Sequence, residues 1–277
     1  MTSSTVNLLR KYPIVSFYIL AFAISWLGWA PQVMASRGAS FFQNPYLQLL
    51  LILPALGPML AAVIVTRILK GKGGPSALLA SLFYWRVGIT WYALALFGPV
   101  VLLSGAVALD ILFSDKIPDL GRVGAETLFA GLTALVIALL SNPWEEVGWR
   151  GFALRKFQAR YNAFIATLIV GLLWSLWHLP LFLIKGHPMS TIPVLPSLIG
   201  IITNAFIYTW LYNSSKGSLL IVSIFHVSLN TVGATLLTVH TGSRLNLAVV
   251  SCCVAGLLLV VYGPARLSRQ LPPKGIV

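Results

Sequence analysis

Long runs of apolar residues alternate with short polar breaks along nearly the whole chain. Eight runs reach about twenty residues, the length at which an α-helix crosses the hydrocarbon core of a bilayer. They predict membrane-spanning helices at 14–34, 46–68, 89–112, 126–150, 163–184, 194–212, 218–239 and 245–264. No internal repeat or second domain interrupts the pattern, so we expect one all-α, polytopic membrane domain over residues 1–277.

The break between the second and third runs has a distinct composition. Residues 71–75 contain three Gly and a Pro and predict a flexible interruption, and 76–86 is predicted to be a short amphipathic segment at the membrane interface. The first run follows Arg10 and Lys11 and is longer than the apolar core of a signal peptide, so we expect it to be a retained helix.

The basic residues between the runs predict the orientation. An even number of helices puts both termini on one side, and the side richer in Lys and Arg faces the cytoplasm. Of the 19 basic residues, only five fall at the far side: Arg37, Lys116, Arg122, Lys185 and Arg244. We therefore predict cytoplasmic termini, an external loop from Asp110 to Arg122, and a location in the cell membrane.

The composition supports membrane insertion and argues against nucleic-acid binding. Hydrophobic residues make up 58% of the chain and charged residues 9%, with a mean hydropathy of +0.88. The excess of 19 Lys and Arg over 6 Asp and Glu lies in short clusters between apolar runs, not along one polar face. Cys252 and Cys253 are neighbours within a predicted helix, which fits neither metal ligands nor a disulfide pair.

Three groups of polar residues lie inside the predicted helices. They are Glu145 and Glu146 with Arg150, then His178, then His226 with Asn230. A carboxylate inside a bilayer helix costs about 2.5 to 3.5 kcal/mol, so two adjacent ones need partners, protonation or a water-filled cavity.

Helix lengths predict that these groups share one depth. If the fourth and fifth helices form a hairpin turning at 161–162, Glu145 and His178 each lie about 24 Å from the turn at about 1.5 Å per residue. If the basic end of the fourth helix projects about 10 Å into the cytoplasm, both lie roughly 12 to 15 Å deep. His226, about nine residues into its helix, reaches the same level.

Spacing within the fourth helix predicts a division of roles. Residues four apart share a helix face, so Glu146 can pair with Arg150. We expect Arg150 to neutralise Glu146, leaving Glu145 to face the histidines. Pro143 is expected to bend the helix just before the pair and to release backbone groups for water.

Each polar group also has a purely structural interpretation. A Glu–Arg pair, a membrane histidine or an Asn can simply join helices by hydrogen bonds. The shared depth favours a joint site. His187 and His240 fall near the opposite surface and are expected to stay outside it, and most Trp residues are expected to be interfacial anchors.

A carboxylate and an imidazole in one cavity can deprotonate a water molecule, while a second imidazole and an amide can stabilise an oxyanion. This is the chemistry of a peptide hydrolase. No nucleophile elbow, Ser-Lys pair or catalytic Cys competes with it, which favours direct attack by water. Glu145, His178 and His226 could also hold a Zn²⁺ ion, although the chain lacks His-Glu-x-x-His, so zinc and metal-free mechanisms both stay open.

Three sequence patterns resemble the motifs of a known family of membrane proteases. In chain order they are Glu145-Glu146-x-x-x-Arg150, Trp174-x-x-x-His178 and His226-x-x-x-Asn230. Their order and spacing, over about 140–232, resemble the CAAX protease and bacteriocin-processing family, also called ABI proteins. Trp174 stands where the second motif often has Phe. The expected catalytic core spans about 124–240.

The resemblance implies an intramembrane endopeptidase of mainly α-helical fold. Glu145 and His178 would activate water, His226 and Asn230 would stabilise the oxyanion, and a membrane-associated or lipidated peptide would be cleaved near the membrane. Membrane lipids and this peptide are the implied partners, without nucleic acid. Family members variously trim prenylated tails, process bacteriocins or serve as scaffolds, and the residues do not select among these substrates.

Two functions from other classes stay open. A proton-coupled transporter also places carboxylates and histidines inside the membrane, although we find no inverted repeat or paired broken helices here. A catalytically idle immunity or scaffold protein would keep the fold, and the presence of every motif residue weighs against it.

Overall fold

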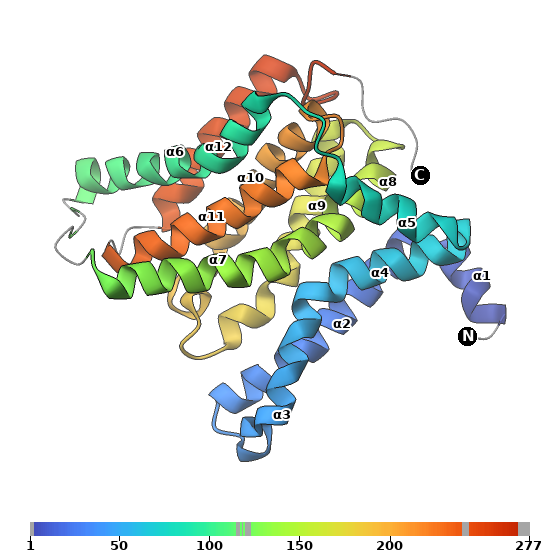
Figure 1. Ribbon diagram of the computed structural model, residues 1–277, viewed down its shortest axis with the longest axis horizontal. Coiled ribbons are helices and arrows are strands. Elements are labelled where there is room, and N and C mark those ends of the chain that lie inside the picture. Colours follow the sequence, from blue (N-terminus) through green and yellow to red (C-terminus); the bar gives the residue numbers. More distant parts are fainter. Residues whose placement is uncertain (1–2, 115–116, 118, 120–122, 240–243, 271–277) are drawn as a thin grey trace.

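The computed structural model describes residues 3–114, 117, 119, 123–239 and 244–270. Over this part the chain is helical and contains no strand (Figure 1). Eight helices are long and apolar enough to cross a membrane. The predicted all-α, multi-pass membrane fold is therefore confirmed, with each observed span overlapping a predicted one.

The long helices and their short neighbours follow in chain order. The long ones are α2 (Pro13–Ser36), α4 (Ile52–Lys70), α6 (Ile89–Ser114), α7 (Ala125–Glu146), α9 (Ala163–Trp177), α10 (Val194–Ser214), α11 (Leu219–Val239) and α12 (Arg244–Tyr262). The short ones are α1 (Ser3–Lys11), η1 (Ser40–Gln43), α3 (Pro45–Gln48), η2 (Leu49–Leu51), α5 (Gly73–Ala80), η3 (Ser81–Phe83), η5 (Val147–Leu154), α8 (Arg155–Gln158), η6 (Leu179–Leu183) and η7 (Pro188–Thr191).

The break after α4 is shorter than predicted. Gly71 ends α4 in a left-handed conformation with φ +71°, which glycine adopts without steric cost. The next helix already begins at Gly73, because Pro75 falls in its first turn, where a proline is tolerated. The segment that follows has an inward face, with Leu78 and Leu82 buried.

Two groups of helices make up the molecule. In Figure 1, α2 and α4 lie side by side as one arm, and the remaining long helices form the other part. There, α11 packs against α7 and α6, while α10 packs against α9 and α12. The two groups of helices meet where Pro58 of α4 approaches Gly148. A Cβ atom added to Gly148 would lie only 2.5 Å from the Pro58 ring. This close approach requires glycine.

The described ends of the chain lie at one end of the bundle. Arg10 of α1 donates a hydrogen bond to the carbonyl of Ile68 near the end of α4. After α12, the carbonyl of Ala265 accepts from the backbone of Ala163 at the start of α9, which directly follows α8. This arrangement is the one expected for an even number of crossings. The predicted loop from Asp110 to Arg122 lies largely outside the described residues.

The helix that carries Glu145 and Glu146 changes its geometry directly after these two residues. α7 runs through Glu146 and continues as the π-helix η5 before α8 begins at Arg155. Pro143, at which a bend was expected, lies inside α7, so the departure from α-helical geometry comes one turn later. π-Helical turns widen the backbone and are frequent at functional sites. The turn after this composite helix falls at 159–162, where the hairpin was predicted.

Candidate active site

The predicted pair of Glu146 and Arg150 is confirmed. Both side chains have no solvent exposure, and Nη1 of Arg150 lies 3.0 Å from Oε1 of Glu146. Both belong to the same α7–η5 helix, four residues apart. An unpaired charge at this depth would be strongly destabilising, so each partner stabilises the other.

Aromatic rings enclose the Arg150 guanidinium on two further sides. Its Cζ atom lies 4.3 Å from the ring centroid of Trp174 on α9 and 4.3 Å from that of Tyr208 on α10. A desolvated cation over an aromatic face gains about 2 kcal/mol. Arg150 therefore joins three helices at the centre of the molecule.

Glu146 also holds a histidine, which differs from the expected division of roles. Nδ1 of His226 on α11 lies 2.9 Å from the same Oε1 atom of Glu146. The sequence pattern placed the histidines beside Glu145, because spacing within one helix cannot show which residue faces the packed α11. Glu146 is thus the carboxylate that carries both Arg150 and His226.

Glu145 makes its contact with the neighbouring helix. Its Oε2 atom accepts a hydrogen bond of 3.2 Å from the indole N–H of Trp174. The side chain is buried but reaches a cavity, whereas Glu146 does not line it. Glu145 is therefore the carboxylate of the pair that a bound molecule could reach.

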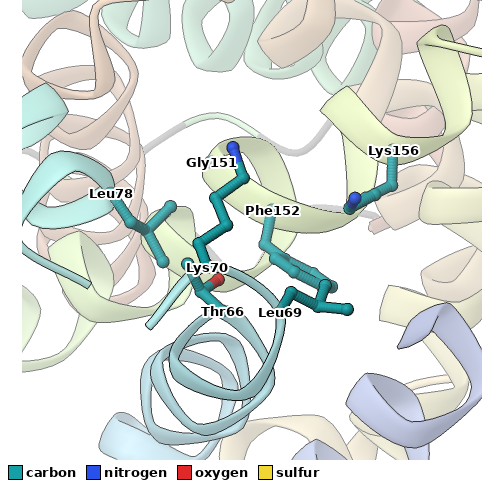
Figure 2. A pocket seen from close by; sticks show the side chains of 7 residues that line it. All are labelled: Thr66, Leu69, Lys70, Leu78, Gly151, Phe152 and Lys156. Carbon is teal, nitrogen blue, oxygen red and sulfur yellow. The ribbon is translucent and has the colours of Figure 1, made fainter. Parts of the chain in front are cut away.

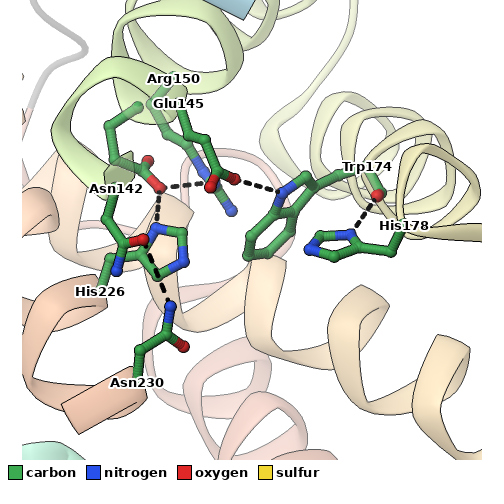
Figure 3. Close-up of polar contacts among 8 residues, drawn as sticks. Asn142, Glu145, Arg150, Trp174, His178, His226 and Asn230 are labelled. Atoms are coloured by element: carbon green, nitrogen blue, oxygen red, sulfur yellow. Dashed lines mark hydrogen bonds and ion pairs between the residues drawn. The ribbon is translucent and has the colours of Figure 1, made fainter. Parts of the chain in front are cut away.

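His178 sits where α9 ends. It caps the helix, and its Nδ1 atom lies 2.8 Å from the carbonyl oxygen of Trp174, one turn back (Figure 3). A carbonyl only accepts, so Nδ1 carries the proton and Nε2 is left as an acceptor. The backbone therefore orients the ring and selects its tautomer.

Asn230 is joined to a residue that the sequence pattern did not single out. Its Nδ2 atom donates to Oδ1 of Asn142 on α7 at 3.3 Å, and the hydroxyl of Ser141 donates to the same oxygen at 3.0 Å. The Nδ2 atom of Asn142 is buried without a hydrogen-bond partner. The sequence could have singled out Asn142 by its spacing. Asn142 precedes Glu145 by three residues, so the two side chains share one face of the helix.

One cavity of about 560 Å³ collects these groups. Glu145, His178, His226 and Asn230 all line it, together with Asn142. Three separate segments thus deliver polar side chains to one place, as the depth argument predicted. The catalytic roles of these residues stay predictions.

The cavity extends from the polar layer toward the end of the bundle away from the described chain ends. On α11 it is lined from His226 to Leu236, and on α7 from Ile137 to Glu145. Asp110 at the end of α6 lies on its wall. Most other lining side chains are apolar, so the polar layer forms one end of a largely apolar chamber.

His187 lies closer to this site than expected. It lines the same cavity, and its Nδ1 atom accepts a hydrogen bond of 3.1 Å from the backbone N–H of Met189. Leu181, Pro188 and Met189 of the same segment after α9 also line the cavity, so this segment forms part of its wall. His240 lies outside the described residues.

The three side chains that could hold zinc, Glu145, His178 and His226, are not grouped as metal ligands in this arrangement. Within the described ranges, no three His, Cys, Asp or Glu side chains are placed to hold one ion. Nδ1 of His226 is committed to Glu146 and Nδ1 of His178 to a carbonyl. We therefore assign no chemical step to a metal.

Comparison with known proteins identifies the segment that contains the site. Residues 127–232 match the family of type II CAAX prenyl endopeptidases described as Rce1-like. The resemblance to the CAAX proteases is confirmed. The matched segment begins in α7, ends in α11, and contains all three motifs.

The chain is also similar to a single protein along much of its length. The chain is 27% identical over 234 residues to a protein named CAAX prenyl protease 2 from Methanococcus maripaludis. The similarity covers 79% of this chain and 83% of the archaeal protein. It therefore extends well beyond the segment that carries the three motifs.

Proposed function

We propose that this protein is an intramembrane endopeptidase that cleaves a membrane-associated or lipidated peptide with a water molecule activated by Glu145. The observation that carries the proposal is the cavity in which Glu145, His178, His226 and Asn230 converge from three helices. The Rce1-like family match over the same segment supports the reaction class.

Glu145 is the general base in this mechanism. Its carboxylate reaches the cavity, and the Trp174 indole holds one oxygen, leaving the other for a water molecule. His178 offers Nε2 as an acceptor for the second hydrogen of that water. Glu145 takes one proton, the water oxygen attacks the peptide carbonyl, and the proton then passes to the departing amine.

His226 and Asn230 stabilise the oxyanion that forms on the attacked carbonyl. His226 can donate through Nε2 to that oxygen when its ring carries protons on both nitrogens, with the Nδ1–H directed at Glu146. Asn142 adds an unpartnered amide N–H that can bind a substrate carbonyl.

The shape of the cavity fits an amphipathic substrate. Its polar layer can take a peptide, and its apolar walls, such as Leu103 and Leu181, can take a hydrocarbon chain. The name of the Methanococcus relative points to a prenylated peptide for that protein. We extend this substrate class to the present chain as part of the proposal.

Cleavage of a peptide panel tests the proposal. Purified protein is incubated with matched peptides that carry or lack a C-terminal prenyl group, beside the Glu145→Gln variant, and products are identified by mass spectrometry. We expect cleavage of prenylated peptides by the wild type and loss of cleavage in the variant. Equal cleavage by the wild type and the variant would contradict the role proposed for Glu145, and no product from any peptide would favour an idle scaffold or a transporter.

A further inference from the structure

A small pocket lies at the basic end of the bundle, apart from the active-site cavity. Lys70 at the end of α4 and Lys156 of α8 line it, together with the apolar side chains of Leu69, Leu78 and Phe152 (Figure 2). Two ammonium groups thus share a pocket whose floor is hydrocarbon. This combination matches an amphipathic anion.

The positive charges around this pocket repel one another. Lys70 and Lys156 line the same pocket, and Arg155 and Arg160 flank Lys156 in the chain. Arg155 is mostly buried, and its Nη1 atom has no hydrogen-bond partner. Four cations therefore lie close together, and the cluster would be stabilised by a negative charge.

Among the described residues that line the pocket, none is a carboxylate. After Glu126 the only acidic residues are Glu145 and Glu146, which belong to the active site. Glu126 itself precedes Arg155 by 29 positions along one nearly continuous helix, which corresponds to about 45 Å. The other three acidic residues, Asp110, Asp115 and Asp119, all fall at or just after the end of α6.

We propose that this pocket binds the phosphate headgroup of an anionic membrane phospholipid. Lysine is a common phosphate ligand, and basic residues at the ends of membrane helices attract anionic headgroups. The adjacent apolar side chains favour a lipid over a free anion, because they can receive the start of an acyl chain. The pocket also lies where α4 and the composite α7–η5–α8 helix reach the end of their membrane spans.

A lipid in this pocket would connect the two arms of the molecule. Lys70 belongs to the α4 arm, while Lys156 follows the π-helix that contains Arg150. A shared phosphate would replace repulsion between these segments with attraction to one anion. Lipid binding is therefore expected to stabilise the packing of α4 against the helix that carries the active site.

Thermal unfolding of delipidated protein in a neutral detergent tests this proposal independently of peptidase activity. The probes are short-chain phosphatidylglycerol, short-chain phosphatidylcholine and inorganic phosphate at equal concentration. We expect only phosphatidylglycerol to raise Tm. The Lys70→Gln/Lys156→Gln variant should need roughly tenfold or more phosphatidylglycerol for the same shift.

A matched variant controls for the loss of two positive charges. Lys216 and Arg269 lie at the same end of the bundle but do not line the pocket, so Lys216→Gln/Arg269→Gln should respond like the wild type. An equal response from both double variants would overturn the proposal, as would an equal shift with phosphatidylcholine or inorganic phosphate. If the lysine variant does not fold, native mass spectrometry of the Lys156→Gln single variant should still show less retained phosphatidylglycerol than the wild type, and equal retention would contradict the site.

Discussion

The indole N–H of Trp174 donates a 3.2 Å hydrogen bond to the carboxylate of Glu145, across the interface between α9 and α7. The same ring lies against the Arg150 guanidinium, with 4.3 Å between the ring centroid and Cζ. Trp174 therefore positions the proposed general base and also shields the cation beside it. The Phe often found at this motif position could do only the second.

Trp174→Phe separates these two contributions. The variant keeps an aromatic ring beside Arg150 but loses the donor to Glu145, and a hydrogen bond to a charged group is worth about 1.5 to 3 kcal/mol. We expect kcat to fall about tenfold to hundredfold, with KM and Tm nearly unchanged. Trp177→Phe is the matched control, because the Trp177 indole N–H has no partner in the described structure. Equal kcat values for the two variants would contradict the positioning role.

Arg150 is expected to contribute mainly to the stability of the fold and not to the catalytic step. Arg150→Ala removes one partner of the buried Glu146–Arg150 ion pair, and breaking such a pair typically costs about 3 to 5 kcal/mol. We expect a clearly lower Tm and lower folded yield in detergent. The double variant Glu146→Gln/Arg150→Met removes both charges and should recover part of the lost stability. An inactive Arg150→Ala protein with wild-type Tm would instead place the arginine in the catalytic step.

The positions of the helices follow from the sequence because membrane insertion depends on local composition. Runs of about twenty apolar residues predict the spans, and the pairing of Glu146 with Arg150 follows from their i, i+4 spacing. The prediction that Glu145 and His178 share one depth follows from the helix rise and an assumed hairpin between their helices. Each of these inferences uses information contained within one segment or one hairpin.

Contacts between distant helices do not follow in this way. The bond from His226 to Glu146 depends on which face of α7 meets α11, and no local pattern reports that rotation. The hydrogen bonds of the π-helix η5 span one residue more than those of an α-helix, and this change has no compositional signature. In the sequence, Asn142 resembles an ordinary helix-packing residue. Only the structure shows that it lines the cavity with an unpartnered amide N–H.

The orientation in the membrane is predicted from the basic residues and can be measured by cysteine labelling. Cys252 and Cys253 are first replaced by Ala, and single cysteines are introduced at Val123 and Lys216, which are both exposed and lie at opposite ends of the bundle. We expect an impermeant reagent to label Val123→Cys in intact cells and Lys216→Cys only after permeabilisation. The reverse pattern would overturn the predicted cytoplasmic termini.

Activity is expected to survive metal removal. The described His, Cys, Asp and Glu side chains form no three-ligand group, and the proposed mechanism uses only protein groups and water. Metal content measured after chelation and dialysis, beside peptidase activity of the same sample, provides the test. Activity that disappears with the metal and returns on adding one equivalent of Zn²⁺ would contradict this mechanism.

The most direct test of the proposed mechanism compares Glu145→Gln with Glu146→Gln in protein of equal folded yield. Glu145 reaches the cavity and is proposed as the base, so Glu145→Gln should lower kcat by about 10² to 10⁴ while Tm stays close to wild type. Glu146→Gln removes the carboxylate that holds Arg150 and His226, so it should lower Tm as well as activity. Wild-type turnover by Glu145→Gln would contradict the central claim.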